Sequence, residues 1–173
     1  MHQNYFELFD FESAFLIDLG LLSGRYRDLQ AAVHPDRFVN ATDADKRVAM
    51  ERVVQINEAF ATLKDPVRRA MHMLSLQGID GLDANDTSMP IDFLMEQVEW
   101  REAIADARLK EDAERLEAIN EELTGMSRSL ADTFAAAYAG EHFKVATTLA
   151  RKMRFVQKLL EEVDAMLGEV DAL

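Results

Sequence analysis

The apolar residues of this chain recur every three or four positions, which is the spacing of an α-helix with one buried face. One such stripe runs over residues 22–33 and follows Asp18, a candidate N-cap. Another runs over residues 49–63 behind Thr42 and Asp45, which resemble a capping box. The chain has three prolines, and each falls between such stretches: Pro35, Pro66 and Pro90. The pattern therefore predicts an all-α protein.

The two N-terminal stripes are expected to pack as an antiparallel hairpin, because a short polar segment joins them. His34 precedes Pro35, and a residue before proline is disfavoured in the α-helical region, so the first long helix should end there. An exposed loop would then run from His34 to about Ala41, at the tip of the hairpin. Short helices around residues 5–9 and 66–77 would cover its sides.

The composition changes between residues 76 and 90, where Gly, Asn, Asp and Ser replace large apolar residues. We therefore expect an N-terminal domain over residues 1–76, a linker over 77–90 and a C-terminal domain over 91–173. Three helices are predicted in the last, over residues 91–107, 109–139 and 141–170, with breaks near Arg108 and at Gly140. Leu109 begins the stripe of the middle helix. The last two helices would form a hairpin with the first laid against it, as a three-helix bundle.

The first helix of this bundle carries two apolar stripes. At about 100° per residue, counted from Phe93, one stripe lies within about 40° and contains Trp100 and Ile104. The other lies at about 100–200° and consists of Ile91, Leu94, Met95 and Val98. A helix in a bundle uses one face for the core. The second stripe is therefore expected to be exposed for a partner, unless the linker or the N-terminal domain covers it.

The formal charge is 19 − 32 = −13, and it is unevenly distributed. Residues 1–75 contain 9 basic and 11 acidic side chains, whereas residues 76–173 contain 10 and 21, a net charge of −11. Acidity of this size argues against nucleic acid and anionic membranes as partners, because both would repel the chain. A basic protein partner remains possible.

The chain contains no cysteine, which excludes disulfides, thiolate zinc sites and an iron-sulfur cluster held by its own sulfurs. No metal site or cofactor is predicted. No signal peptide and no run of 18 apolar residues is visible, so we expect a cytoplasmic protein. His72 has no carboxylate or histidine at ligand spacing and is expected to have a packing or surface role.

The tripeptide His34-Pro35-Asp36, followed by Arg37, is the main candidate for function in the first half. On its own it is consistent with an ordinary proline turn in which Asp36 caps a bend. Two helical stripes flank it, however, and the runs at residues 5–9 (YFELF) and 56–63 (INEAFATL) accompany it. Together these features resemble a J domain of the DnaJ class.

The rest of the chain narrows the resemblance to the HscB family, the J-type co-chaperones of iron-sulfur cluster assembly. It rests on LSLQG at residues 74–78 and FLMEQVEWRE at 93–102. The family implies that the J domain docks on the DnaK-class ATPase HscA and stimulates ATP hydrolysis, while the C-terminal domain holds the scaffold protein IscU. It implies chaperone contacts by His34, Pro35 and Asp36, beside which we place Arg37 and Arg27. It implies scaffold contacts by Leu94, Met95, Val98, Glu99, Arg101, Glu102, Asp106 and Phe155.

One departure from the J-domain pattern concerns the helix before the tripeptide. J domains usually carry several basic residues there, whereas this chain has Asp28 and two alanines beside Arg25 and Arg27. Docking on a chaperone should therefore depend less on this helix than it does in other J domains.

Two other hypotheses remain. The chain could be an acidic helical adaptor, whose binding to a basic partner would weaken steeply with salt. An enzyme using His34 and Asp36 as a dyad lacks any nucleophile or cofactor motif, so the chain is not expected to be an enzyme.

Overall fold

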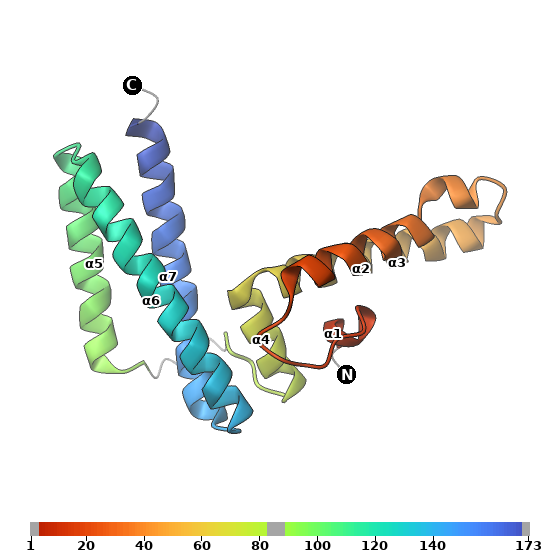
Figure 1. The fold of residues 1–173 in the computed structure, drawn as a ribbon, viewed down its shortest axis with the longest axis horizontal. Helices are drawn as coiled ribbons and strands as arrows, with labels where there is room; N and C mark the ends of the chain where they lie inside the picture. The colour runs from red at the N-terminus through yellow and green to blue at the C-terminus, as the bar shows by residue number, and fades with distance from the viewer. Residues whose placement is uncertain (1–3, 83–88, 171–173) are drawn as a thin grey trace. The chain divides into compact units, whose positions relative to one another are not determined.

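The computed structural model describes residues 4–82 and 89–170. Over these ranges the chain forms seven α-helices and a short 3-10 helix, with no strand (Figure 1). The all-α fold predicted from the sequence is therefore confirmed. The chain divides into two compact units, Met1–Ile79 and Asp80–Leu173. Part of the expected linker, residues 83–88, lies outside the described residues. None of the described helices is long and apolar enough to span a membrane.

The N-terminal unit contains α1 (Tyr5–Leu8), α2 (Leu19–Ala32), the 3-10 helix η1 (Pro35–Phe38), α3 (Asp43–Lys64) and α4 (Pro66–Leu76). Helices α2 and α3 lie side by side as an antiparallel hairpin, with η1 at its tip (Figure 1). Both predicted caps are present. Asp18 Oδ1 accepts the Leu21 N–H at 2.9 Å, and Thr42 Oγ1 accepts the Asp45 N–H at 3.2 Å. These bonds satisfy amide groups that the first turn of each helix leaves without a partner.

The segment after α2 differs from the expected open loop, because Pro35–Phe38 form one turn of 3-10 helix. Proline favours the first position of a helical turn, where its fixed φ fits and its missing N–H is not needed. The Arg37 N–H donates to the His34 carbonyl at 3.0 Å and closes the turn. His34 itself stays extended, with ψ at 135°, as expected for a residue before proline.

The hairpin is held together by buried side chains and by an aromatic pair near its middle. Phe6, Leu22 and Ile56 are fully buried between the helices. The rings of Tyr26 and Phe60 stack with centroids 4.0 Å apart, and the Tyr26 hydroxyl donates to Asn57 Oδ1 at 2.9 Å. This packing fixes the register of α2 against α3 and therefore the position of η1.

Two polar side chains have structural roles in this unit. His72 is buried and stacks on Tyr5, while its Nε2 accepts the Tyr5 backbone N–H at 3.2 Å, so it has the packing role expected of it. Arg25 Nη1 donates to the carbonyls of Phe9 and Asp10, and its guanidinium lies 4.7 Å from the Phe11 ring centroid. Arg25 thus anchors the segment between α1 and α2.

Arg69 is a buried cation of the same unit, with only 7% of its surface exposed. Its Nη1 donates to the Leu63 carbonyl at 2.6 Å, and its guanidinium lies 4.9 Å from the Phe15 ring centroid. Burial lowers the pKa of Arg69, and the neighbouring Asp65 opposes that shift. Arg69 therefore joins the end of α3 to the segment that precedes α2.

We predict that Arg69→Ala lowers the free energy of unfolding by about 2–4 kcal/mol, since it removes packing and leaves a buried carbonyl unsatisfied. Urea unfolding followed by circular dichroism measures this. The matched control is Arg68→Ala, which removes an exposed neighbour and should change stability by less than about 0.5 kcal/mol. Equal stabilities of the two variants would contradict the structural role of Arg69.

The C-terminal unit is a three-helix bundle of α5 (Ile91–Leu109), α6 (Ala113–Ala139) and α7 (Phe143–Val170). Helices α6 and α7 pack along one another, and α5 lies against α6 (Figure 1). All three helices contribute to the core, with Trp100 half-buried against it. The buried core residues are Ile104, Ala107, Leu116, Ile119, Leu123, Val156, Leu159, Val163 and Met166.

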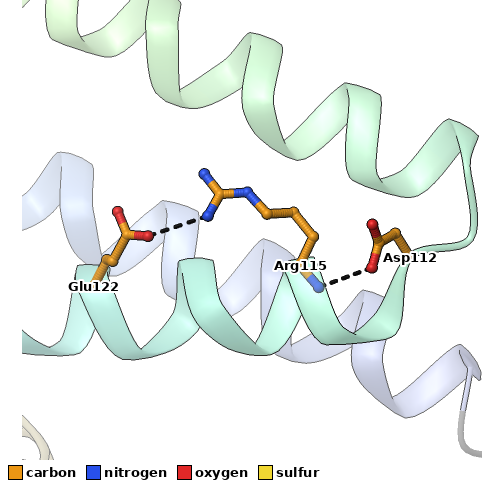
Figure 2. Close-up of polar contacts among 3 residues, drawn as sticks. All are labelled: Asp112, Arg115 and Glu122. Carbon is orange, nitrogen blue, oxygen red and sulfur yellow. Dashed lines mark hydrogen bonds and ion pairs between the residues drawn. The ribbon is translucent and has the colours of Figure 1, made fainter.

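The first break in this unit lies later than the sequence analysis predicted. Helix α5 continues through Arg108 to Leu109, and α6 begins only at Ala113. Glu111 adopts a positive φ of 51°, and Asp112 then caps α6 by accepting the Arg115 N–H at 2.9 Å. Figure 2 shows this cap and the Arg115 side chain, which donates to Glu122 Oε1 at 3.2 Å. The break thus follows the cap at Asp112, and Leu109 belongs to the outer end of α5.

Candidate functional site

The first candidate site consists of His34, Pro35, Asp36 and Arg37, here called the η1 tip. All four residues are exposed. The side chains of His34 and Asp36 are 59% and 88% exposed. Behind them Phe38 is half-buried, and η1 packs against α3. The hairpin therefore presents a short polar turn on a fixed base.

The tip has a defined pattern of donors and acceptors. His34 Nδ1 accepts the Asp36 N–H at 3.3 Å. A ring nitrogen that accepts a hydrogen bond carries no proton, so in the neutral ring the hydrogen is on Nε2. Asp36 Oδ2 lies 3.6 Å from the same ring nitrogen. A partner would therefore meet an N–H donor and a carboxylate acceptor, both on a backbone restricted by proline.

The two basic residues expected beside the tripeptide lie apart from each other. Arg37 is part of η1, whereas Arg27 lies on α2, about two helical turns before the tip. Both side chains are exposed. Arg25 is occupied by its bonds to Phe9 and Asp10, so Arg27 is the basic side chain that α2 offers to a partner.

The second candidate site is the outer face of α5. Ile91, Leu94, Met95 and Val98, here called the α5 outer patch, are 69%, 42%, 60% and 56% exposed. Phe93, Ile104 and Ala107 of the other stripe are buried. The two stripes thus separate into a core face and an exposed face. Within the described part of the C-terminal unit, only the first stripe is buried in the core.

One apolar residue of this face was not predicted to belong to it. Leu109 lies at about 160° from Phe93, the same angle as Ile91, and is 84% exposed. It was assigned to the core of the next helix because its spacing continued that stripe. The cap at Asp112, which follows it by three residues, was the signal that could have placed it correctly.

Phe155 lies on α7 and packs against α5. It is half-buried against the core, and its ring meets Phe93 edge to face at a centroid distance of 5.5 Å. The Arg101 guanidinium lies 5.7 Å from the Phe155 centroid. Phe155 therefore supports the bundle and also contributes to its surface.

Two hollows of about 330 and 540 Å³ lie between α5 and α7, and Arg101 lines both. Phe155 lines the smaller one, while Leu109 lines the larger. The smaller hollow also contacts Gly81 and Leu82 and three cations of α7, Arg151, Arg154 and Lys158. The surface beside the α5 outer patch is therefore indented and suited to side chains of a partner.

Acidic residues border the patch on the side away from Arg101. Glu99, Glu102 and Asp106 are exposed and lie at about 180–240° from Phe93. Asp106 Oδ2 accepts a hydrogen bond from Lys110 Nζ at 2.7 Å, which raises the pKa of Lys110. Asp106 already has this partner within the chain. Glu99 and Glu102 are therefore the more available carboxylates.

The described residues contain no group of three or more His, Asp or Glu side chains that could hold a metal ion.

The family model "HSCB C-terminal oligomerisation domain" matches residues 89–164. The "Co-chaperone protein HscB homolog" of Shewanella woodyi is 41% identical, covering 96% of this chain and 99% of its own.

Two solved structures resemble the whole fold. "Chaperone HscB from Vibrio cholerae" superposes with a TM-score of 0.86 at 37% identity, covering 97% of this chain and 99% of its own. The human co-chaperone protein HscB has a TM-score of 0.88 at 28% identity, covering 94% and 81%. Similarity of this extent includes both units. The chain therefore belongs to the HscB family of J-type co-chaperones.

Proposed function

We propose that this co-chaperone acts in the cytoplasm, stimulates the ATPase of the DnaK-class chaperone HscA, and delivers the scaffold protein IscU to it for cluster maturation and transfer. The η1 tip would contact HscA, while the α5 outer patch and its polar neighbours would hold IscU. No catalytic reaction of its own is required. The observation that carries the proposal is the presence of two exposed sites of different chemistry, one in each unit.

The η1 tip suits a regulatory contact with an ATPase. Asp36 offers a carboxylate to a cation of the partner, and a charge-assisted hydrogen bond of this kind is about twice as strong as a neutral one. The His34 ring offers an N–H on the same turn. The restricted backbone lowers the entropy lost when these groups are ordered on binding.

The α5 outer patch suits a protein partner. Burial of Leu94, Met95 and Val98 would contribute roughly 1 kcal/mol or more each, at about 25 cal/mol per Å² of apolar surface. Glu99, Arg101 and Glu102 surround this apolar centre with charge, and an apolar centre with a polar rim is the usual composition of a protein interface. A purely electrostatic adaptor would not need the apolar centre.

Steady-state ATP hydrolysis by purified HscA tests the proposal directly, with this chain, IscU, or both added. We expect the two together to raise the rate more than the sum of their separate effects, because one molecule would bring IscU and the η1 tip to HscA at a high effective concentration. An unchanged rate under all conditions would contradict the proposal. An acidic adaptor would bind IscU in a strongly salt-dependent way and leave the rate unchanged.

A further inference from the structure

The acidic C-terminal unit contains one strongly basic segment. Over residues 143–160, helix α7 has five Lys and Arg residues and no Asp or Glu. The next ten residues, 161–170, contain four acids and no base. Residues 76–173 have ten basic side chains in all, so half of them lie in this stretch of α7. Residues 143–160 therefore have a positive net charge, although residues 76–173 as a whole have a net charge of −11.

Three of the five basic side chains of this segment gather at one place. Arg151, Arg154 and Lys158 are spaced three and four residues apart, so they share one face of α7 over about 10 Å. Together with Arg101 of α5 they line the smaller hollow, and none of the described residues that line it carries a carboxylate. We call these four residues the basic wall. Arg154 and Lys158 are exposed, and within the described part of the chain neither forms an ion pair.

An aromatic pair holds two cations, one of them Arg101 of the hollow, without neutralising them. Arg101 lies over Phe155, and Lys152 Nζ lies 4.7 Å from the Phe93 ring centroid. The two rings pack edge to face. Ring faces attract cations but contribute no net negative charge. The positive potential at this place is therefore preserved for an anionic group from outside.

The basic wall and the acidic residues lie on opposite sides of the α5 outer patch. Around α5, Arg101 is at about 80° from Phe93, Leu94 and Val98 at about 100–140°, and Glu102 at about 180°. The apolar strip is thus bordered by positive charge toward α7 and by negative charge on the other side. Such a surface accepts a complementary partner in one orientation, because the reverse orientation would place like charges together.

We infer that the basic wall binds carboxylates of the partner that covers the α5 outer patch, so that the acidic edge of that partner lies over α7. This inference rests on the proposed function, which supplies IscU as that partner. A single small oxyanion would reach only part of a row about 10 Å long, whereas an acidic protein segment can place several carboxylates along it. The wall also adjoins an apolar surface that a small anion would not use.

The test compares two double charge reversals by calorimetric titration with IscU. Arg154→Glu with Lys158→Glu changes the basic wall. Arg128→Glu with Lys144→Glu makes the same change of net charge at exposed positions of the same unit outside the wall. We expect the first to raise the Kd about 10-fold or more in about 0.05 M salt, falling toward about 3-fold in about 0.5 M salt. The second should raise the Kd less than about 3-fold.

Equal effects of the two double variants would overturn the inference, since net charge alone would then explain them. An unchanged Kd for the wall variant would overturn it as well, and so would inorganic phosphate that binds the wild type at the wall without competing with IscU. A wild-type protein that binds no IscU would instead contradict the proposed function. Thermal melts of both variants confirm that the bundle is intact.

Discussion

An Asp36→Asn variant is expected to lose at least about 90% of its stimulation of HscA, because the amide keeps the shape of the side chain but loses its charge. A hydrogen bond to a charged group contributes roughly 1.5–3 kcal/mol, equivalent to about 10- to 150-fold in rate or affinity. The Asp36 side chain is 88% exposed, and its Oδ2 lies 3.6 Å from His34 Nδ1. Stability should therefore change by less than about 0.5 kcal/mol.

The measurement is the steady-state rate of ATP hydrolysis by HscA over a range of co-chaperone concentrations, with IscU present. Asp28→Asn is the matched control, since Asp28 is an exposed aspartate on α2 of the same unit, and it should retain stimulation within about 2-fold. Both variants should bind IscU as tightly as the wild type. Full stimulation by Asp36→Asn would refute the assignment of the η1 tip.

Leu94→Ala is expected to weaken binding of IscU by about 10- to 50-fold, because Leu94 lies at the centre of the proposed interface, where truncation of an apolar anchor costs most. Leu94 is 42% exposed before binding, so a partner can bury much of its remaining surface. The loss should persist in about 0.5 M salt, since apolar contacts are not screened. This behaviour distinguishes the patch from the basic wall, whose contribution declines with salt.

Calorimetric titration at two salt concentrations measures this effect. Val48→Ala is the control, because Val48 is an exposed apolar residue of α3, outside the patch. Leu94→Ala should still stimulate HscA when IscU is absent, and should lose the additional stimulation that IscU provides. Binding equal to that of the wild type would remove the α5 outer patch from the proposed interface.

Local signals predicted much of the fold. The caps at Asp18 and Thr42 and the separation of the two stripes on α5 followed from residue type and spacing. Leu109 was misassigned because a helical stripe does not show where one helix stops and the next continues the same spacing. The 3-10 turn after His34 was missed because proline before a short polar run is consistent with both a loop and a helical turn.

The candidate sites also differ in whether the sequence alone could indicate them. The η1 tip and the α5 outer patch each lie within one segment, so the sequence could indicate them. The basic wall combines Arg101 of α5 with three residues of α7, about 50 positions further along the chain. Only the packing of α5 beside α7 brings these residues to one hollow. The net charge of the whole C-terminal half does not reveal these basic residues, because acidic residues elsewhere in it outnumber the basic ones.

Trp100 gives the bundle an optical probe. It is the only tryptophan of the chain, and it lies half-buried in the core stripe of α5, two residues after Val98 of the outer patch. Indole emission responds to changes in local polarity and in neighbouring charge. Occupation of the outer face of α5 should therefore alter the intrinsic fluorescence of the unlabelled protein, so that partner binding can be followed in real time by excitation of a single side chain.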